Sequence, residues 1–181
     1  FYAKICKSYG AEIPFLRPKK LATSNSHELE YIKHLLKFLK KKEGYVPDIV
    51  VRLLSTVPLQ TTNDIDSCIK KLIKNKENES CSVISEAKQH PKKSIKINKL
   101  NYIESYLTRK GEDIGKNQNR NQYEKSYFRS NIVSTKPSTI EKYNSLTGKK
   151  NLYHIIPQNR SIDIDSKIDF EIAEFLAKKY R

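Results

Sequence analysis

The chain contains no methionine, and only five glycines and three cysteines occur among its 181 residues. Neither G-x-G-x-x-G nor G-x-x-x-x-G-K-[ST] is present, so the sequence indicates neither dinucleotide binding nor a P-loop. No apolar stretch approaches the roughly 20 residues that span a membrane, so we expect neither a membrane span nor a signal peptide. Because the chain begins at Phe1 and lacks Met, we expect it to be incomplete at its N-terminus.

The three cysteines, Cys6, Cys68 and Cys81, are far apart in the sequence and odd in number. Each lies in an apolar, periodic segment rather than at a metal-binding spacing. We therefore expect three buried free thiols and a reducing, cytoplasmic location.

The formal net charge of +15 raises the hypothesis of a basic nucleic-acid-binding protein. However, 28 of the 35 basic residues are Lys, whereas bidentate recognition of bases and phosphates favours Arg. A solvated basic surface is the simpler interpretation, and binding to neither nucleic acid nor membrane is expected.

Helical and strand-like segments alternate along the chain, which predicts a single α/β domain over residues 1–181. The polar stretch 98–126 is expected to be a loop, an arm that reaches a partner subunit, or both. In the final helix, Ile168, Ile172, Ala173, Phe175 and Leu176 are expected to face inward. Helices are predicted within 1–9, from the capping cluster Thr23–Ser26 to Gly44, after Thr61–Asn63, and after Ser166. Strands are predicted at 48–54, 81–85, 94–97, 127–135 and 152–156.

Two segments are candidates for chemistry. The loop Ser55–Gln60 leaves a predicted strand and enters a helix, where backbone N–H groups can receive an anion, although an ordinary connection has the same pattern. In Arg160–Asp169, the carboxylates of Asp163 and Asp165 are one residue apart and should project from the same side of an extended backbone. Such a pair suits Mg²⁺ and phosphate chemistry; the alternative is a surface strand leading into a helix capped by Ser166.

Several motifs, in unbroken order from about Tyr9 to Phe175, together resemble those of the acylneuraminate cytidylyltransferase family, the CMP-sialic acid synthetases. The last motif is the most specific. The segments are Gly10–Ala22 (R-P-x-x-L-A), Pro47–Asp66 with Thr56, Pro58 and Leu59 (a strand, an L-Q-P-T-S-P-L-R loop and a D-I-D helix), His90–Lys93 (H-P-x-K), Arg120–Asn131 (R-Q-x-x-x-K-x-Y…N-G) and Ser161–Glu174 (S-I-D-I-D-(S/T)-x-x-D-x-x-x-A-E).

The resemblance implies a Rossmann-like, three-layer α/β fold of the nucleotide-diphospho-sugar transferase type, here without its first strand and phosphate loop. It also implies a homodimer. The implied reaction is attack of the sugar acid's anomeric hydroxyl on the α-phosphate of CTP, with pyrophosphate as the leaving group. Asp163 and Asp165 would be catalytic and would hold Mg²⁺. The implied substrate-binding residues are Arg17, Thr56, Lys93, Arg120, Gln122 and Asn131, of which Arg17, Lys93 and Arg120 would address a phosphate or the sugar carboxylate.

Some positions depart from the family pattern. Gln60 stands where the family has Arg, which removes a fixed cation, and Leu54, Ser55 and Val57 also differ. A catalytically impaired protein that binds a nucleotide sugar therefore remains an alternative. Lys93 and Arg120 could also be merely solvated, and Asn131 could simply occupy a turn.

Overall fold

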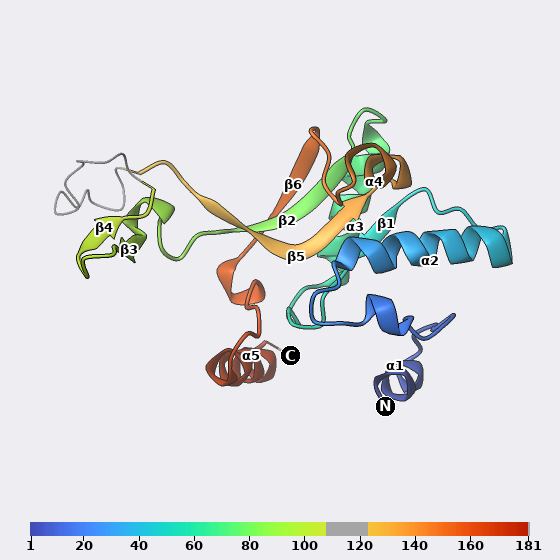
Figure 1. The fold of residues 1–181 in the computed structure, drawn as a ribbon, viewed down its shortest axis with the longest axis horizontal. Coiled ribbons are helices and arrows are strands. Elements are labelled where there is room, and N and C mark those ends of the chain that lie inside the picture. Colours follow the sequence, from blue (N-terminus) through green and yellow to red (C-terminus); the bar gives the residue numbers. More distant parts are fainter. Residues whose placement is uncertain (108–122, 181) are drawn as a thin grey trace. The chain divides into compact units, whose positions relative to one another are not determined.

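The computed structural model describes residues 1–107 and 123–180 (Figure 1). Two compact units divide the chain, the first being Phe1–Asp48 and the second Ile49–Arg181. In the described part of the chain, every helix is too short or too polar to cross a lipid bilayer.

The first unit is helical and consists of α1 (Tyr2–Ser8), η1 (Lys19–Leu21) and α2 (Glu28–Glu43). The predicted stop at Gly44 is confirmed, since this residue adopts the left-handed conformation (φ 64°) that glycine favours after a helix. The predicted cap from Thr23–Ser26 is wrong: His27 is the N-cap of α2 and makes no side-chain capping bond. Instead, the hydroxyls of Thr23 and Ser26 bond to each other at 2.9 Å within a turn.

The second unit contains a four-stranded mixed sheet with the order β1-β5-β2-β6. Strand β5 is antiparallel to both β1 and β2, whereas β6 runs parallel to β2. Strands β1, β2 and β6 therefore end at the same edge of the sheet, as expected for an α/β protein. The bounds are β1 Val50–Arg52, β2 Ser80–Glu86, β5 Tyr127–Thr135 and β6 Asn151–Ile156.

Helix α3 (Thr62–Lys74) packs its apolar face against this sheet. It begins with the predicted cap, because Thr61 and Asp64 form a reciprocal capping box. Its buried residues complete the main hydrophobic core, which comprises Cys68, Leu72, Cys81, Val83, Ile132 and Ile156. The predicted α/β class with a central sheet is confirmed.

The remaining elements of the second unit are shorter or lie beyond the four-stranded sheet. They are η2 (Pro91–Lys93), the antiparallel pair β3 (Ile95–Ile97) and β4 (Ile103–Ser105), α4 (Pro137–Tyr143), η4 (Gln158–Arg160) and α5 (Lys167–Lys179). Figure 1 shows the β3–β4 pair separate from the four-stranded sheet, and α5 beyond the carboxyl end of β6.

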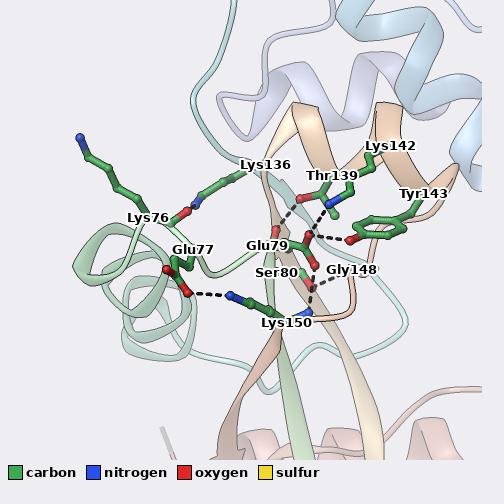
Figure 2. A network of polar contacts seen from close by, with 10 residues as sticks. All are labelled: Lys76, Glu77, Glu79, Ser80, Lys136, Thr139, Lys142, Tyr143, Gly148 and Lys150. Carbon is green, nitrogen blue, oxygen red and sulfur yellow. Dashed lines mark hydrogen bonds and ion pairs between the residues drawn. The ribbon is translucent and has the colours of Figure 1, made fainter.

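A polar network centred on Glu79 holds together the opposite edge of the sheet, where β2 begins (Figure 2). The Glu79 carboxylate accepts hydrogen bonds from the Lys150 backbone N–H (2.9 Å) and the Tyr143 hydroxyl (2.7 Å), and Lys142 Nζ lies 3.3 Å away. These donors lower the pKa of Glu79 to about 2, the Lys150 N–H contributing most. The network therefore joins β2, α4 and the turn before β6.

Three expectations about burial and length require correction. The strand predicted over 48–54 is only Val50–Arg52, because pairing with β5 covers those three residues alone. Cys68 and Cys81 are buried free thiols as expected, but Cys6 is exposed because α1 buries none of its residues. In α5 only Ala173 is buried; Ile168 is 63% exposed and Phe175 64%, since this helix does not stack on the sheet.

Candidate active site at the carboxyl end of the sheet

The sheet topology brings three chain segments to one edge. The loop after β1 contains Thr56, the segment after β6 contains Asp163, and Asn131 is the central residue of antiparallel β5. Arg52, at the end of β1, donates from Nη1 to the Asn131 carbonyl at 2.9 Å, which fixes β5 beside the end of β1. This edge is where ligands bind in open α/β sheets.

The acidic segment Ser161–Asp165 is irregular rather than a strand, yet its side chains alternate in exposure as predicted. Ile162 is buried and Ile164 half-buried, whereas Asp163 and Asp165 are exposed. The backbone N–H of Ile164 donates to the Thr56 carbonyl at 2.8 Å. The two carboxylates therefore face solvent from a segment that is attached to the loop after β1.

A second contact holds Asp163 directly. Asn131 Nδ2 donates to Asp163 Oδ2 at 2.7 Å, a short hydrogen bond to a carboxylate. Among the side-chain contacts of the described residues, this is the one hydrogen bond to the carboxylate of Asp163 or Asp165. Helix α5 begins just after this segment with a capping box in which Ser166 donates to Asp169, as the sequence predicts.

Lys93 lies in η2, beside a hollow of about 370 Å³ at the end of β2. His90 caps η2 by accepting from the Lys92 N–H (3.2 Å), and its ring stacks on Tyr123 at a centroid distance of 4.5 Å. The Lys93 ammonium lies 6.0 Å from the Tyr123 ring centroid. The hollow is lined by Glu86, Ala87, His90, Tyr123, Glu124, Lys125 and Ser126.

A buried carboxylate, Asp64, was not anticipated as part of this site. Its Oδ2 accepts from the Thr61 backbone N–H and hydroxyl, both at 2.9 Å, and from Arg160 Nη1 at 2.5 Å; its Oδ1 lies 3.2 Å from His154 Nε2. Burial alone would raise the pKa of Asp64, but the bonds from Thr61 and His154 and the charge of Arg160 together lower it. Asp64 is therefore an ionised group inside the protein.

The sequence alone identifies only some residues of this cluster. The spacing Thr61-x-x-Asp64 is a recognisable capping box. No local pattern, however, identifies Arg160 or His154 as partners, because both are about 90 or more positions away along the chain.

Of the predicted site residues, the structure brings Thr56, Asn131 and Asp163 together, with Asp165 two positions further along. Lys93 lies beside the hollow described above. Arg17 belongs to the first unit, where its guanidinium stacks 4.0 Å from the Tyr31 ring centroid. Arg120 and Gln122 lie outside the described residues, as does the rest of 108–122 in the predicted arm 98–126. In the described part of that stretch, Ile103–Ser105 form strand β4 rather than loop.

Within residues 1–107 and 123–180, no three His, Cys, Asp or Glu side chains cluster in a way that could enclose a metal ion. A two-carboxylate site nevertheless fits Mg²⁺, which is usually bound by one or two carboxylates together with waters and substrate phosphates. Asp163 and Asp165 are exposed oxygen donors of this kind.

No protein-family model matches the chain. Among curated proteins, it is 27% identical over 179 residues to the N-acylneuraminate cytidylyltransferase of Escherichia coli O18:K1:H7, covering 98% of this chain and 40% of that protein. It is 24% identical over 184 residues to the post-translational flagellin modification protein B of Campylobacter coli, covering 98% of this chain and 73% of that protein. The chain thus spans well under half the length of the first relative.

Among solved structures, the fold is similar to that of a CMP:2-keto-3-deoxy-manno-octonic acid synthetase complexed with CTP. The TM-score is 0.59 at 11% identity, over 98% of this chain and 77% of the other. The resemblance to the acylneuraminate cytidylyltransferase family that the motifs predict is thus confirmed by the first relative across nearly the whole chain. The solved structure confirms the α/β fold.

Proposed function

We propose that this chain is part of a CTP-dependent cytidylyltransferase that transfers CMP to a nonulosonic, sialic-acid-like sugar. The observation that carries the proposal is the contact between Asn131 and Asp163 at the carboxyl end of the sheet, beside Thr56. The relative at 27% identity, which is named an N-acylneuraminate cytidylyltransferase, supports the same reaction class.

In the proposed reaction, the sugar's anomeric oxygen forms a bond to the α-phosphorus of CTP while the bond to the departing pyrophosphate breaks. Little covalent chemistry is left for the protein, so catalysis rests on positioning and on neutralising charge. Asp163 and Asp165 would hold Mg²⁺, which when bound lowers the pKa of the attacking hydroxyl and offsets phosphate charge. The Asn131 amide would keep one Asp163 oxygen in place and leave the other directed at the substrates.

Lys93 would bind an anionic group of the substrate. Its ammonium lies 6.0 Å from the ring centroid of Tyr123, which stacks on His90 and lines the hollow at the end of β2 with it. The roles of Arg17, Arg120 and Gln122 rest on the resemblance alone. A cytoplasmic location is part of the same proposal.

A homodimer is also proposed, and the exposed apolar residues of the β3–β4 pair support it. Ile97 is 73% exposed and Ile103 57%. Two such strands presenting apolar side chains to water are typical of a surface that a second subunit covers. Light scattering at micromolar concentration should give twice the mass of the protomer.

The experiment that tests the proposed function is pyrophosphate release from CTP and a panel of nonulosonic acids. The purified protein should require both substrates and Mg²⁺, and Asp163→Asn or Asp165→Asn should reduce the rate at least about 100-fold. Glu77→Gln is a matched control, because it removes an exposed carboxylate from the opposite edge of the sheet. Equal rates in all four proteins would reject the assignment of the two aspartates.

A second candidate function is binding of a nucleotide sugar without turnover. The observation that favours it is Gln60, where the family has Arg: its amide donates to the Ser130 hydroxyl at 2.6 Å and supplies no charge to a phosphate. Tight binding of CTP or a CMP-sugar with no pyrophosphate released under any condition would favour this function.

A further inference from the structure

The segment that carries Asp163 and Asp165 has a second attachment besides Asn131. Arg160, the last residue of η4, precedes Asp163 by three positions. Its Nη1 donates to Asp64 Oδ2 at 2.5 Å and to the Thr61 hydroxyl at 3.0 Å. The Arg160 side chain therefore links the start of the acidic segment to the first turn of α3.

This contact is more than a helix cap. Thr61 alone satisfies the capping box with Asp64, since its N–H and hydroxyl both reach Oδ2. Asp64 nevertheless has no exposed surface and receives a cation as well. A buried ionised carboxylate requires such a partner, and the cation comes from the segment after β6 rather than from α3 itself.

Two chain segments are consequently tied to each other at two points. Thr56 and Thr61 belong to the connection from β1 to α3. Their partner Ile164 belongs to the acidic segment, and their partner Arg160 directly precedes it. The Ile164–Thr56 bond joins backbone to backbone at 2.8 Å. Of these two ties, only the one through Arg160 is ionic and anchored on a fully buried group.

We propose that Arg160 and Asp64 are positioning residues that set the placement of Asp163 and Asp165 relative to the loop after β1. As far as catalysis is concerned, this inference rests on the proposed function. Neither residue needs to touch a substrate: the ion pair fixes the backbone from which the two acidic side chains project.

The placement itself is measured by amide hydrogen exchange at Ile164, whose N–H bonds to Thr56. In Arg160→Met this amide should exchange at least about tenfold faster than in the wild type, under conditions in which both proteins stay folded. Arg160→Lys should recover part of the protection. The matched control is Lys178→Met, which removes a cation from an exposed pair with Glu174. Wild-type exchange at Ile164 in Arg160→Met would overturn the proposal.

If Arg160→Met does not fold, Arg160→Lys decides the question. Lysine keeps the charge but cannot supply the guanidinium's paired donors, so exchange at Ile164 should rise about threefold. An unchanged rate in this folded variant would likewise overturn the proposal.

The catalytic consequence is read from the Mg²⁺ concentration that gives half-maximal pyrophosphate release. Misplaced aspartates should raise it about tenfold in Arg160→Met, with kcat about 100-fold lower. A variant that is merely partly unfolded would show fewer active molecules but an unchanged Mg²⁺ requirement. If the wild type releases no pyrophosphate, the proposed function fails, and the exchange at Ile164 still tests the positioning.

Discussion

Replacing Asp64 with Asn gives the sharpest test of the buried ion pair. The change keeps the side chain's shape but removes the charge that Arg160 faces at 2.5 Å. Removing one member of a buried pair typically costs about 3–5 kcal/mol. The Arg160 side chain is 29% exposed and can regain some hydration, so we expect the lower end, about 3 kcal/mol.

The assays are urea unfolding and thermal unfolding, both followed by circular dichroism. A loss of about 3 kcal/mol corresponds to a fall in melting temperature of roughly 6–12 °C for a chain of this size. Asp66→Asn is the control, because this carboxylate is exposed on the same helix and should change stability by less than about 0.5 kcal/mol.

A double-mutant cycle with Arg160→Met separates the stability contributed by the Asp64–Arg160 ion pair from that contributed by the helix cap. The double variant leaves no unpaired buried charge, so its loss should be smaller than the sum of the single losses by about 2 kcal/mol. Strict additivity, or an Asp64→Asn variant as stable as the wild type, would refute the reasoning.

The contribution of Asp64 to the free energy of unfolding should depend on pH in one direction. Because the pKa of Asp64 is lower in the folded than in the unfolded state, its contribution is complete above the ordinary value of 3.8. It disappears as the pH falls through the folded-state pKa. The stability difference between wild type and Asp64→Asn should therefore shrink in acid.

Three further predictions concern other contacts. The folded-state pKa of Glu79 is about 2, so Glu79→Gln should remove part of the stability that the wild type loses between about pH 4.5 and 2, as melting curves at each pH would show. Gly148→Ala should destabilise the fold by about 1–3 kcal/mol in urea, since the added Cβ would lie 2.6 Å from Glu79 Cβ; an unaffected midpoint would contradict this. Asn131→Ala should lower kcat/KM about tenfold by releasing Asp163, and a wild-type value would argue against that contact.

The fold was predictable where a local pattern determines it. The apolar run of β2, the caps at Thr61 and Ser166 and the stop at Gly44 are all encoded by neighbouring residues. Helix α4 escaped prediction even though Pro137 occupies its first turn, because Ile140 is its one buried apolar residue and a single residue gives no helical period.

Burial was less predictable than secondary structure. The apolar residues of α1 and α5 suggest core faces, yet Cys6 and Phe175 are exposed. Periodicity identifies an apolar side of a helix but not what lies against it.

The candidate site was predictable in its acidic residues and not in its supports. The motif around Asp163 and Asp165 is local and therefore readable. The bonds from Asn131 to Asp163 and from Arg160 to Asp64 join positions 32 and 96 residues apart, and only the order of the strands brings them together.

The proposed transfer of CMP from CTP to a nonulosonic acid is tested most directly by ³¹P nuclear magnetic resonance of the reaction mixture. We expect a new phosphodiester signal and an equal amount of pyrophosphate with the wild type and Mg²⁺, and neither with Asp163→Asn. A CTP spectrum that stays unchanged with every sugar acid, or a product formed equally well by Asp163→Asn, would contradict it.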